Sequence, residues 1–215
     1  MQSSRTTVKR RAQRAHYDES TIHAILDETF VCTVSYVSQG EARCIPTSYA
    51  RLDDCLILHG SPKAGWLAEL GKNQEICITI VVVDGIVLDS TMLHHSLNYR
   101  SVVLFGVPEV ICEPHSRLQA LKAVIEHIVP GRSADLPLPS PSDLRQTKLI
   151  SLPISEASAK IRSEGPTGQA SDSVWCGEIP TTTKYGPAVA KDIPGESFAT
   201  PPYVVDYRRP GRNNT

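Results

Sequence analysis

Three short stretches of the chain carry side chains that could bind a ligand or take part in chemistry. In the first, LILHGSPKAGWL, an apolar run ends at His59 and Gly60, and Ser61 and Pro62 have the character of a helix start. Free N–H groups at the start of a helix, together with the positive end of its dipole, favour a bound phosphate. Lys63 adds a full positive charge, and Gly60 allows a ligand to approach the backbone closely. The stretch therefore predicts a phosphate site, with an ordinary capped helix and a solvated lysine as the alternative.

The second stretch, HHSLNYRSVVLFG, places polar rings at the entrance of a β-branched run. Side chains alternate along a strand, so Tyr99 and Ser101 are expected to share one face. His94 and His95 would point to opposite faces, so we expect no metal between them. Histidine and tyrosine can act as general acid or base, which makes His95 and Tyr99 the catalytic candidates. A strand with a polar lip is the alternative.

The third stretch, WCGEIP, follows a polar loop and presents Trp175 beside a glycine and a proline. Such a tryptophan can form an aromatic wall over a planar ligand, or it can simply anchor the loop. The chain has neither the GxGxxG motif nor the GxxxxGKS or GxxxxGKT motif of common nucleotide sites. A dinucleotide-binding fingerprint is therefore not expected.

A predominantly antiparallel sheet is expected to position these stretches. The runs FVCTVSYV, ARCIPTSYARL and CLILHG have strand character, and the short turns SQG and LDD between them predict antiparallel pairing. EICITIVVVDGIVLDS is expected to form a hairpin with the dipeptide DG at its turn. Helices are expected after the cap residues Asp18, Ser61 and Ser140, and over residues 116–129, where apolar residues recur at helical spacing. The fold class is therefore mainly β with peripheral helices (α+β), in a closed or nearly closed barrel.

Length and composition indicate one domain with two tails. The 215 residues are enough to bury a sizeable core. Residues 1–16 are basic and contain no acid, so a solvated tail is expected there. Residues 17–185 would form the domain, and the proline-rich residues 186–215 a second tail, one that could wrap a partner subunit.

Charge and cysteine usage exclude several classes of partner. The formal net charge of -1 gives no general attraction for nucleic acid. No apolar run approaches the roughly 20 residues needed to cross a bilayer, and no signal peptide opens the chain. The six cysteines form no CxxC pair and several lie in apolar runs. We therefore expect buried thiols and a cytoplasmic location rather than a disulfide framework.

Four segments, taken in order, are similar to a known family: NYRSVVLFG, KAVIEHIVPGR, DLRQTKLISLPISEASAKIR and WCGEIP. They resemble the flavin-binding proteins related to pyridoxamine phosphate oxidase, most closely the branch that includes the nitroimidazole-resistance reductases. The resemblance extends from about residue 10 to about residue 190. It implies an FMN-binding split β-barrel and a homodimer with two flavin sites at the subunit interface.

The resemblance also implies which side chains contact the flavin. Those near the isoalloxazine ring or ribityl chain are Thr47, Ser48 and Tyr49; those around the phosphate are His59, Gly60, Ser61 and Lys63; those along the flavin are Tyr99, Arg100 and Ser101. His95 would stand at the mouth of the pocket, and Trp175 would close it, from the other subunit if the site is shared.

One departure concerns the phosphate, because the oxidase carries an arginine where this chain has Pro62. The phosphate would then depend on Lys63, on the helix start, and on help from Arg43 or Arg100.

The function implied by the resemblance is that of an FMN-dependent oxidoreductase acting on a small organic substrate. FMN would supply the redox chemistry, and the protein would bind and orient it. A non-catalytic flavin carrier and a haem-binding split-barrel relative are the two alternatives.

Overall fold

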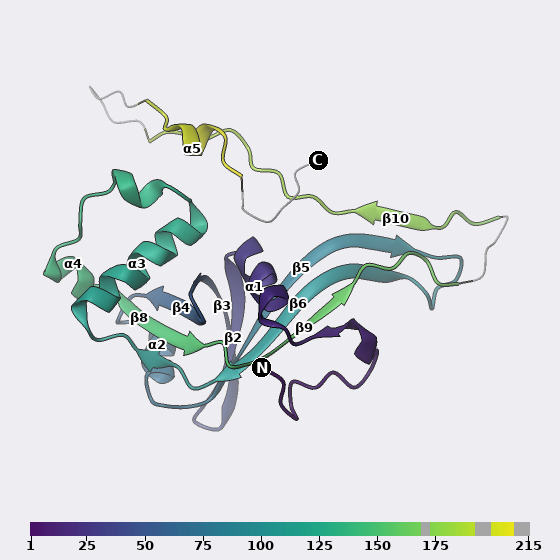
Figure 1. The fold of residues 1–215 in the computed structure, drawn as a ribbon, viewed down its shortest axis with the longest axis horizontal. Helices are drawn as coiled ribbons and strands as arrows, with labels where there is room; N and C mark the ends of the chain where they lie inside the picture. The colour runs from purple at the N-terminus through teal and green to yellow at the C-terminus, as the bar shows by residue number, and fades with distance from the viewer. Residues whose placement is uncertain (169–172, 192–198, 209–215) are drawn as a thin grey trace.

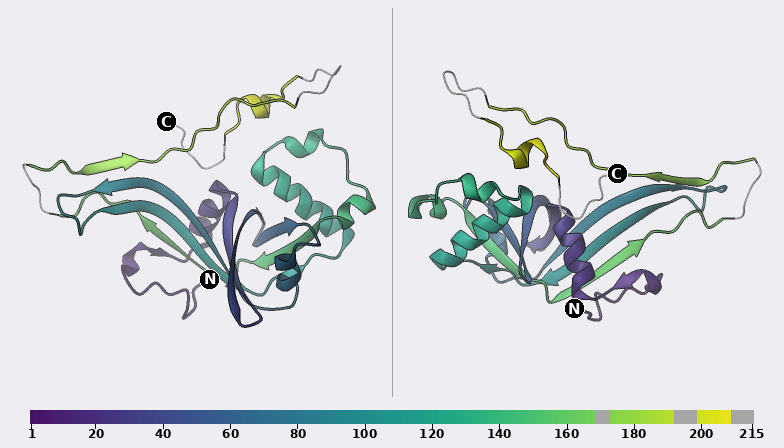
Figure 2. Two further views of the ribbon diagram at one scale, coloured as in Figure 1. Left: turned by 180° about the vertical axis from the view of Figure 1, so that it is seen from behind. Right: turned by 45° about the horizontal axis from the view of Figure 1, so that its top comes forward.

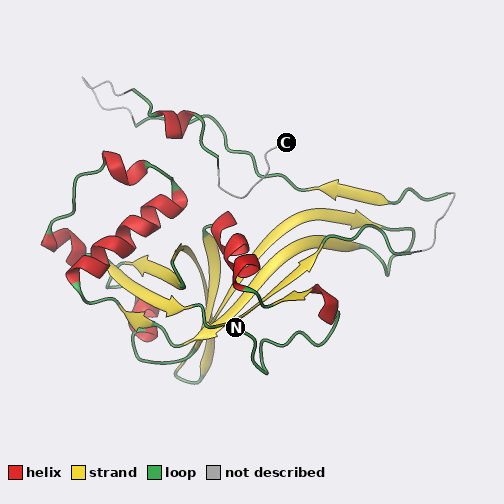
Figure 3. Ribbon diagram, in the orientation of Figure 1, coloured by secondary structure: helices red, strands yellow, loops and turns green. Residues whose placement is uncertain are grey.

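A computed structural model describes residues 1–168, 173–191 and 199–208. Antiparallel strands dominate it, and the helices lie around them (Figures 1 and 3), so the expected fold class is confirmed. The strands are β1 (Ala15–His16), β2 (Val31–Ser38), β3 (Glu41–Leu52), β4 (Cys55–Gly60), β5 (Ile76–Leu88), β6 (Ser96–Gly106), β7 (Glu109–Val110), β8 (Lys148–Pro153), β9 (Glu156–Arg162) and β10 (Gly177–Pro180). The helices are α1 (Glu19–Glu28), α2 (Gly65–Leu70), α3 (Pro114–Ile128), α4 (Pro141–Arg145) and α5 (Pro202–Val205), with 3-10 turns η1 (Ala12–Arg14) and η2 (Arg132–Asp135).

The sheet follows the strand order β1-β9-β6-β5-β2-β3-β4-β8-β7, with β10 added on the edge of β5. Its inner face buries apolar side chains from alternate strand positions, as Val34, Ile78 and Leu104 show. A smaller cluster forms where α3 covers β3, β4 and β8. Strand β4 is therefore buried on both faces, with Leu56 and Leu58 in the main core and Ile57 in the smaller cluster, as strand alternation requires.

Helix α1 follows the sequence pattern closely. The side chain of Asp18 accepts a hydrogen bond from the backbone N–H of Thr21 at 2.8 Å, which caps the helix. Ile22 and Leu26 are fully buried against the inner face of the sheet. The capping box expected at Ser140 is also present, at the start of α4.

Helix α2 starts later than the sequence predicts, so the prediction that Ser61 caps it is wrong. It begins at Gly65, and its N-cap is Ala64. The hydroxyl of Ser61 instead accepts from the N–H of Lys63 at 3.2 Å, while Ala64 donates to the carbonyl of Ser61 at 2.9 Å. These bonds close a separate turn, which uses the groups that a helix start would have left free.

The expected hairpin at Asp84-Gly85 is also wrong, because β5 continues through this dipeptide. The pairing with β6 passes from Val83 opposite Tyr99 to Gly85 opposite Asn98, which makes Asp84 the extra residue of a β-bulge. Beyond the bulge β5 and β6 extend away from the barrel as a long ribbon with β10 alongside (Figures 1 and 2). We call this ribbon, residues 85–98 with β10, the arm.

Residues 1–16, expected as a solvated tail, lie against the sheet. Strand β1 pairs with β9, and Thr6 is only 3% exposed. Arg5 donates to Glu75 at 2.6 Å and to Glu156 at 2.8 Å, so its charge is matched by two acids far along the chain. The expectation of a free basic segment is therefore corrected.

The described part of residues 186–215 also contacts its own chain. The hydroxyl of Tyr207 donates to the carbonyl of Ile128, and Arg132 donates to the hydroxyl of Tyr203 at 3.0 Å. These contacts hold α5 and the residues after it beside the C-terminal end of α3. Residues 192–198 and 209–215 lie outside the described part, and the expectation that the tail wraps a partner stays a prediction.

Two further expectations concern membranes and thiols. Across the described residues, no helix is both long and apolar enough to cross a membrane. All six cysteines are free. Cys32 is buried, as expected for a core thiol, but Cys44 and Cys112 are exposed.

Candidate functional site

The strand register defines an uncovered side of the sheet. Pro46, Thr33, Thr79 and Val103 are directly paired across β3, β2, β5 and β6, and their side chains share the face opposite the core. We call this side the outer face. It continues along the arm, because Ile86 is paired with both Leu97 and Ile179.

Three predicted flavin contacts lie on the outer face. Ser48 is paired with Val31, and Ser101 with Val81, whose side chains are 50% and 55% exposed. Tyr99 is two residues from Ser101 and therefore faces the same way. The structure thus gathers Ser48, Tyr99 and Ser101 over one open surface.

Tyr49 does not belong to this surface, and its predicted flavin contact is corrected. Its side chain is fully buried, and its hydroxyl donates to the carbonyl of Leu26 at 2.7 Å. Its ring lies 5.3 Å from that of His127, between α1 and α3. Thr47 is on the same side of β3 as Tyr49, because the two are separated by one residue.

The side chain of Arg100 is also engaged in contacts within the protein. Its guanidinium donates to Asp84 at 2.6 and 2.9 Å and to Glu28 at 2.8 Å. The hydrogen bonds that Arg100 donates to Asp84 and Glu28 raise the pKa of its guanidinium above the ordinary value. A phosphate would have to displace two carboxylates, so Arg100 is not the helper that the sequence suggested. Arg43 is similarly ion-paired with Glu41.

The predicted phosphate stretch keeps one available cation. Lys63 is exposed, and within the described chain its ammonium has no acidic partner. Gly60 serves packing, because a Cβ there would meet the Leu67 side chain at 2.9 Å. A second cation lies opposite Gly60 in the ladder: Lys148 of β8. No local sequence pattern indicates Lys148, since only the register of β4 with β8 places it there.

His59 carries a buried ring nitrogen that the described residues leave without a hydrogen-bond partner. Its side chain is half-buried, and its Nδ1 is buried without a hydrogen-bond partner among the described residues. Burial lowers the pKa of His59, which keeps the imidazole neutral. A buried polar atom without a partner is a position that a bound group or a second subunit can satisfy.

His94 and His95 lie in the loop before β6, and the expectation that strand geometry turns them to opposite faces does not apply. The Nδ1 of His95 donates to the carbonyl of Thr91 at 2.9 Å, which leaves its Nε2 as an acceptor when the ring is neutral. His94 contacts the hydroxyl of Thr91 at 2.7 Å. Both rings are exposed.

Trp175 stands at the same end of the arm as His95. It is two residues before Gly177, which pairs with Leu88, while Val87 pairs with Ser96. Its indole is 67% exposed. The arm's tip and α2 lie at opposite ends of the molecule (Figures 1 and 2), so one chain does not bring Trp175 or His95 to Lys63.

The fold also forms an aromatic cavity that sequence reasoning missed. It has a volume of about 380 Å³ and lies between the C-terminal end of α3 and the C-terminal segment. Its walls are Phe30, Ile128, Val129, Tyr185, Gly186, Ala188, Val204 and Tyr207. The rings of Tyr185 and Tyr207 meet edge to face, with centroids 4.7 Å apart. The segments that form it are distant in sequence, so no local pattern signals it.

Comparison with protein-family models shows to which family this barrel belongs. The family model of pyridoxamine 5'-phosphate oxidase matches residues 18–161. The chain therefore belongs to this family, and the resemblance seen in its motifs is confirmed.

Several solved structures are similar to this chain. The flavocytochrome Anf3 from Azotobacter vinelandii is similar over 96% of this chain and 97% of its own, with 29% identity and a TM-score of 0.87. The FAD and heme binding protein from Mycobacterium smegmatis is similar over 89% and 95%, with 29% identity and a TM-score of 0.82. A putative 5-nitroimidazole antibiotic resistance protein from Bacteroides thetaiotaomicron VPI-5482 shares the fold over 68% and 86%, with 22% identity and a TM-score of 0.58. No curated protein sequence matches the chain.

Proposed function

We propose that this chain is a flavin-dependent oxidoreductase that works as a homodimer and also binds haem. The observation that carries the proposal is the extent of its likeness to two proteins described as a flavocytochrome and as an FAD and heme binding protein. The family match ends at residue 161, whereas these two structures cover 96% and 89% of the chain. Most of the segment that follows the family match is thus shared with proteins described as holding both groups.

The outer face supports the dimer. Six aliphatic side chains on it are 37–55% exposed: Val31, Val81, Val83, Ile86, Leu97 and Ile179. An uncovered apolar surface of this kind marks a contact with another molecule. A second copy seated on the outer face would bring residues of its arm towards the barrel, which the single chain keeps apart.

The flavin would lie between the two subunits, over Ser48, Tyr99 and Ser101 of one chain. The exposed ammonium of Lys63 is the charge available for a phosphate, and the indole of Trp175 is the ring available from the partner's arm. A flavin supplies hydride or single-electron transfer when bound. His95 and Tyr99 would hold or move a proton beside it, because each carries a titratable group at the exposed surface.

Haem fits the histidines that remain available. His59 is neutral and half-buried with an unpartnered nitrogen, and the Nε2 of His95 is free to accept once its Nδ1 donates to Thr91. Neutral imidazole is the form that binds iron. We propose His59 as the haem contact, because its buried Nδ1 has no hydrogen-bond partner among the described residues.

The single phosphate position argues for FMN, whereas the likeness to an FAD and heme binding protein argues for FAD. We propose FAD, and FMN is the alternative.

The test is the cofactor content of the purified protein, with mass analysis of the ligands released by heat. A flavin spectrum together with a haem Soret band is expected, and light scattering should give twice the chain mass of 23.5 kDa. Flavin without haem, even after reconstitution with haemin, would leave the plain flavin-dependent oxidoreductase of the sequence prediction. Absence of both groups after reconstitution would contradict the proposed function.

Two valines provide a matched test of the dimer. Val81→Asp places a charge on the outer face and should yield a monomer with weakened flavin binding. Val110→Asp places the same charge on β7, where the valine is also partly exposed, and should remain a dimer. A dimeric Val81→Asp protein with full flavin affinity would contradict the shared site.

A further inference from the structure

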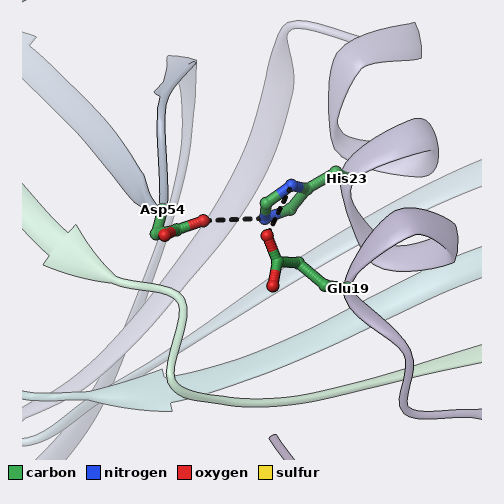
Figure 4. Close-up of side chains that lie close together, drawn as sticks. All are labelled: Glu19, His23 and Asp54. Atoms are coloured by element: carbon green, nitrogen blue, oxygen red, sulfur yellow. Dashed lines mark ion pairs between the residues drawn. The ribbon is translucent and has the colours of Figure 1, made fainter.

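A cluster of potential metal-ligating side chains lies between α1 and the turn that joins β3 to β4. It consists of Glu19, His23 and Asp54, whose ligand atoms all lie within 4.8 Å of one another. Figure 4 shows the two carboxylates approaching the imidazole from different elements. Glu19 is one helical turn before His23, so their side chains stack on one face of α1.

The imidazole of His23 lacks the hydrogen bonds that its burial demands. Its side chain is 14% exposed, and Nε2 is buried with no hydrogen-bond partner in the described chain. Nε2 lies 3.7 Å from a carboxylate oxygen of Asp54, and the other ring nitrogen, Nδ1, lies 3.8 Å from a carboxylate oxygen of Glu19. Both distances exceed the usual hydrogen-bond range of about 2.7–3.2 Å. A buried polar atom left in this way usually has a partner that the protein does not itself supply.

A metal ion fits these separations. Ligand atoms that each lie about 2.1 Å from a tetrahedral metal are about 3.4 Å apart, so the 3.7 Å between Nε2 and Asp54 needs a shift of only a few tenths of an ångström. The three ligand atoms lie within 4.8 Å of one another, so closing the whole set needs a carboxylate movement of up to about 1.4 Å. The carboxylates are 62% and 73% exposed and can make that movement, and their exposure leaves room for water as a further ligand. Their two negative charges would match the charge of a divalent ion.

We propose that Glu19, His23 and Asp54 form a binding site for a divalent first-row transition metal, with zinc as the best-suited ion. One imidazole nitrogen with two carboxylate oxygens is a ligand set that zinc accepts. The guanidinium of Arg51 donates to Asp27 at 2.6 and 2.7 Å, so it is engaged by that carboxylate and not by the cluster.

The bound ion joins two parts of the fold. Asp54 belongs to the turn between β3 and β4, whose backbone is fixed by a bond from the N–H of Ile154 to the carbonyl of Asp54 at 2.8 Å. Glu19 and His23 belong to the first turns of α1. The metal therefore clamps the start of α1 to the sheet, and it acts on stability rather than on the flavin site.

The experiment is zinc binding by tag-free protein under reducing conditions, measured by equilibrium dialysis. The exposed cysteines can also bind zinc, so the result is read as a difference between variants. Wild type should bind one more zinc per chain than His23→Gln. Glu19→Gln and Asp54→Asn should weaken that site at least tenfold, and zinc should raise the melting temperature of wild type more than that of any of the three.

Asp53→Asn is the matched control, because it removes a carboxylate from the same turn without touching the cluster. It should bind zinc as wild type does. Equal zinc content in wild type and His23→Gln would overturn the proposal, and so would full affinity in both Glu19→Gln and Asp54→Asn. The side chains of Glu19 and Asp54 are largely exposed, so their variants should fold. They therefore remain informative if His23→Gln folds poorly.

Discussion

Arg100 in β6 and Glu28 at the end of α1, 72 residues apart in sequence, form an ion pair that ties the helix to the sheet. The Glu28 carboxylate is only 3% exposed, whereas the Arg100 side chain is 29% exposed. Asp84, the extra residue of the bulge, binds the same guanidinium. A residue that the sequence assigned to the flavin thus joins three elements of the fold.

Arg100→Met should lower the free energy of unfolding by about 3 kcal/mol, because it leaves the buried Glu28 carboxylate without its charge partner. Urea denaturation of the apoprotein measures the change. The double variant Arg100→Met with Glu28→Gln should recover part of the loss, since the buried charge of Glu28 is then removed together with that of Arg100. A loss below 1 kcal/mol in the single variant would contradict the assignment of Arg100 to structure.

Tyr49→Phe should cost about 1–3 kcal/mol of stability, because the carbonyl of Leu26 loses a buried donor. Flavin affinity should not change, since the hydroxyl is turned into the core. Ser48→Ala, one residue earlier and on the outer face, should show the reverse pattern. Chemical denaturation and flavin titration of both variants separate the two roles.

Lys63→Ala should weaken flavin binding about tenfold to a hundredfold, the equivalent of one charge-assisted hydrogen bond to phosphate. The control is Lys72→Ala, because the ammonium of Lys72 is already bound to Glu69 at 2.6 Å. Fluorescence titration of the apoprotein gives both affinities. If the two variants bind flavin equally well, Lys63 is only a surface lysine.

The contact between Arg5 and Glu156 should make stability depend on pH in the acid range. Hydrogen bonds from Arg5 lower the pKa of Glu156 from 4.5 to about 2. A carboxyl whose pKa is lower in the folded state stabilises fully above its unfolded value, and this contribution is lost as pH falls through the folded value. Wild type should therefore lose melting temperature between about pH 4.5 and pH 2 faster than Arg5→Gln. Parallel curves for the two proteins would show that the contact does not form in solution.

Thiol labelling should follow burial. Burial raises the pKa of Cys32 to about 12, so its reactive thiolate is suppressed, whereas Cys44 and Cys112 are exposed. Iodoacetamide should modify Cys44 and Cys112 in the native protein, and Cys32 only after denaturation. Peptide mass mapping reads each site, and native labelling of Cys32 would contradict its place in the core.

The predictions that succeeded depend on local periodicity. The alternation in β2 and the spacing of Ile22, Ile25 and Leu26 in α1 are visible in a short window, and both elements form as expected. The failures come from competition between local signals and distant partners. Asp84-Gly85 resembles a hairpin turn, but β6 pairs along both sides of it, and Arg100 binds the aspartate.

Site residues were harder to predict because their roles depend on which face of the sheet is covered. The sequence places Ser48 and Tyr49 side by side, yet packing of α1 and α3 commits only Tyr49 to the core. The basic N-terminal segment shows the same limit. The partners of Arg5 are 70 and 151 residues away, and no local pattern connects them.

The bulge at Asp84 has a consequence for how the length of β5 can change. Before it, the odd-numbered Val81 and Val83 face outward, and after it the even-numbered Ile86 does. Deleting Asp84 alone would join two segments whose side chains already alternate between the two faces in the same phase. It would also remove the ion pair between Asp84 and Arg100. A deletion elsewhere in β5 that left the bulge in place would instead turn one half of the strand over. Among related chains, insertions and deletions in this strand should therefore collect at the bulge.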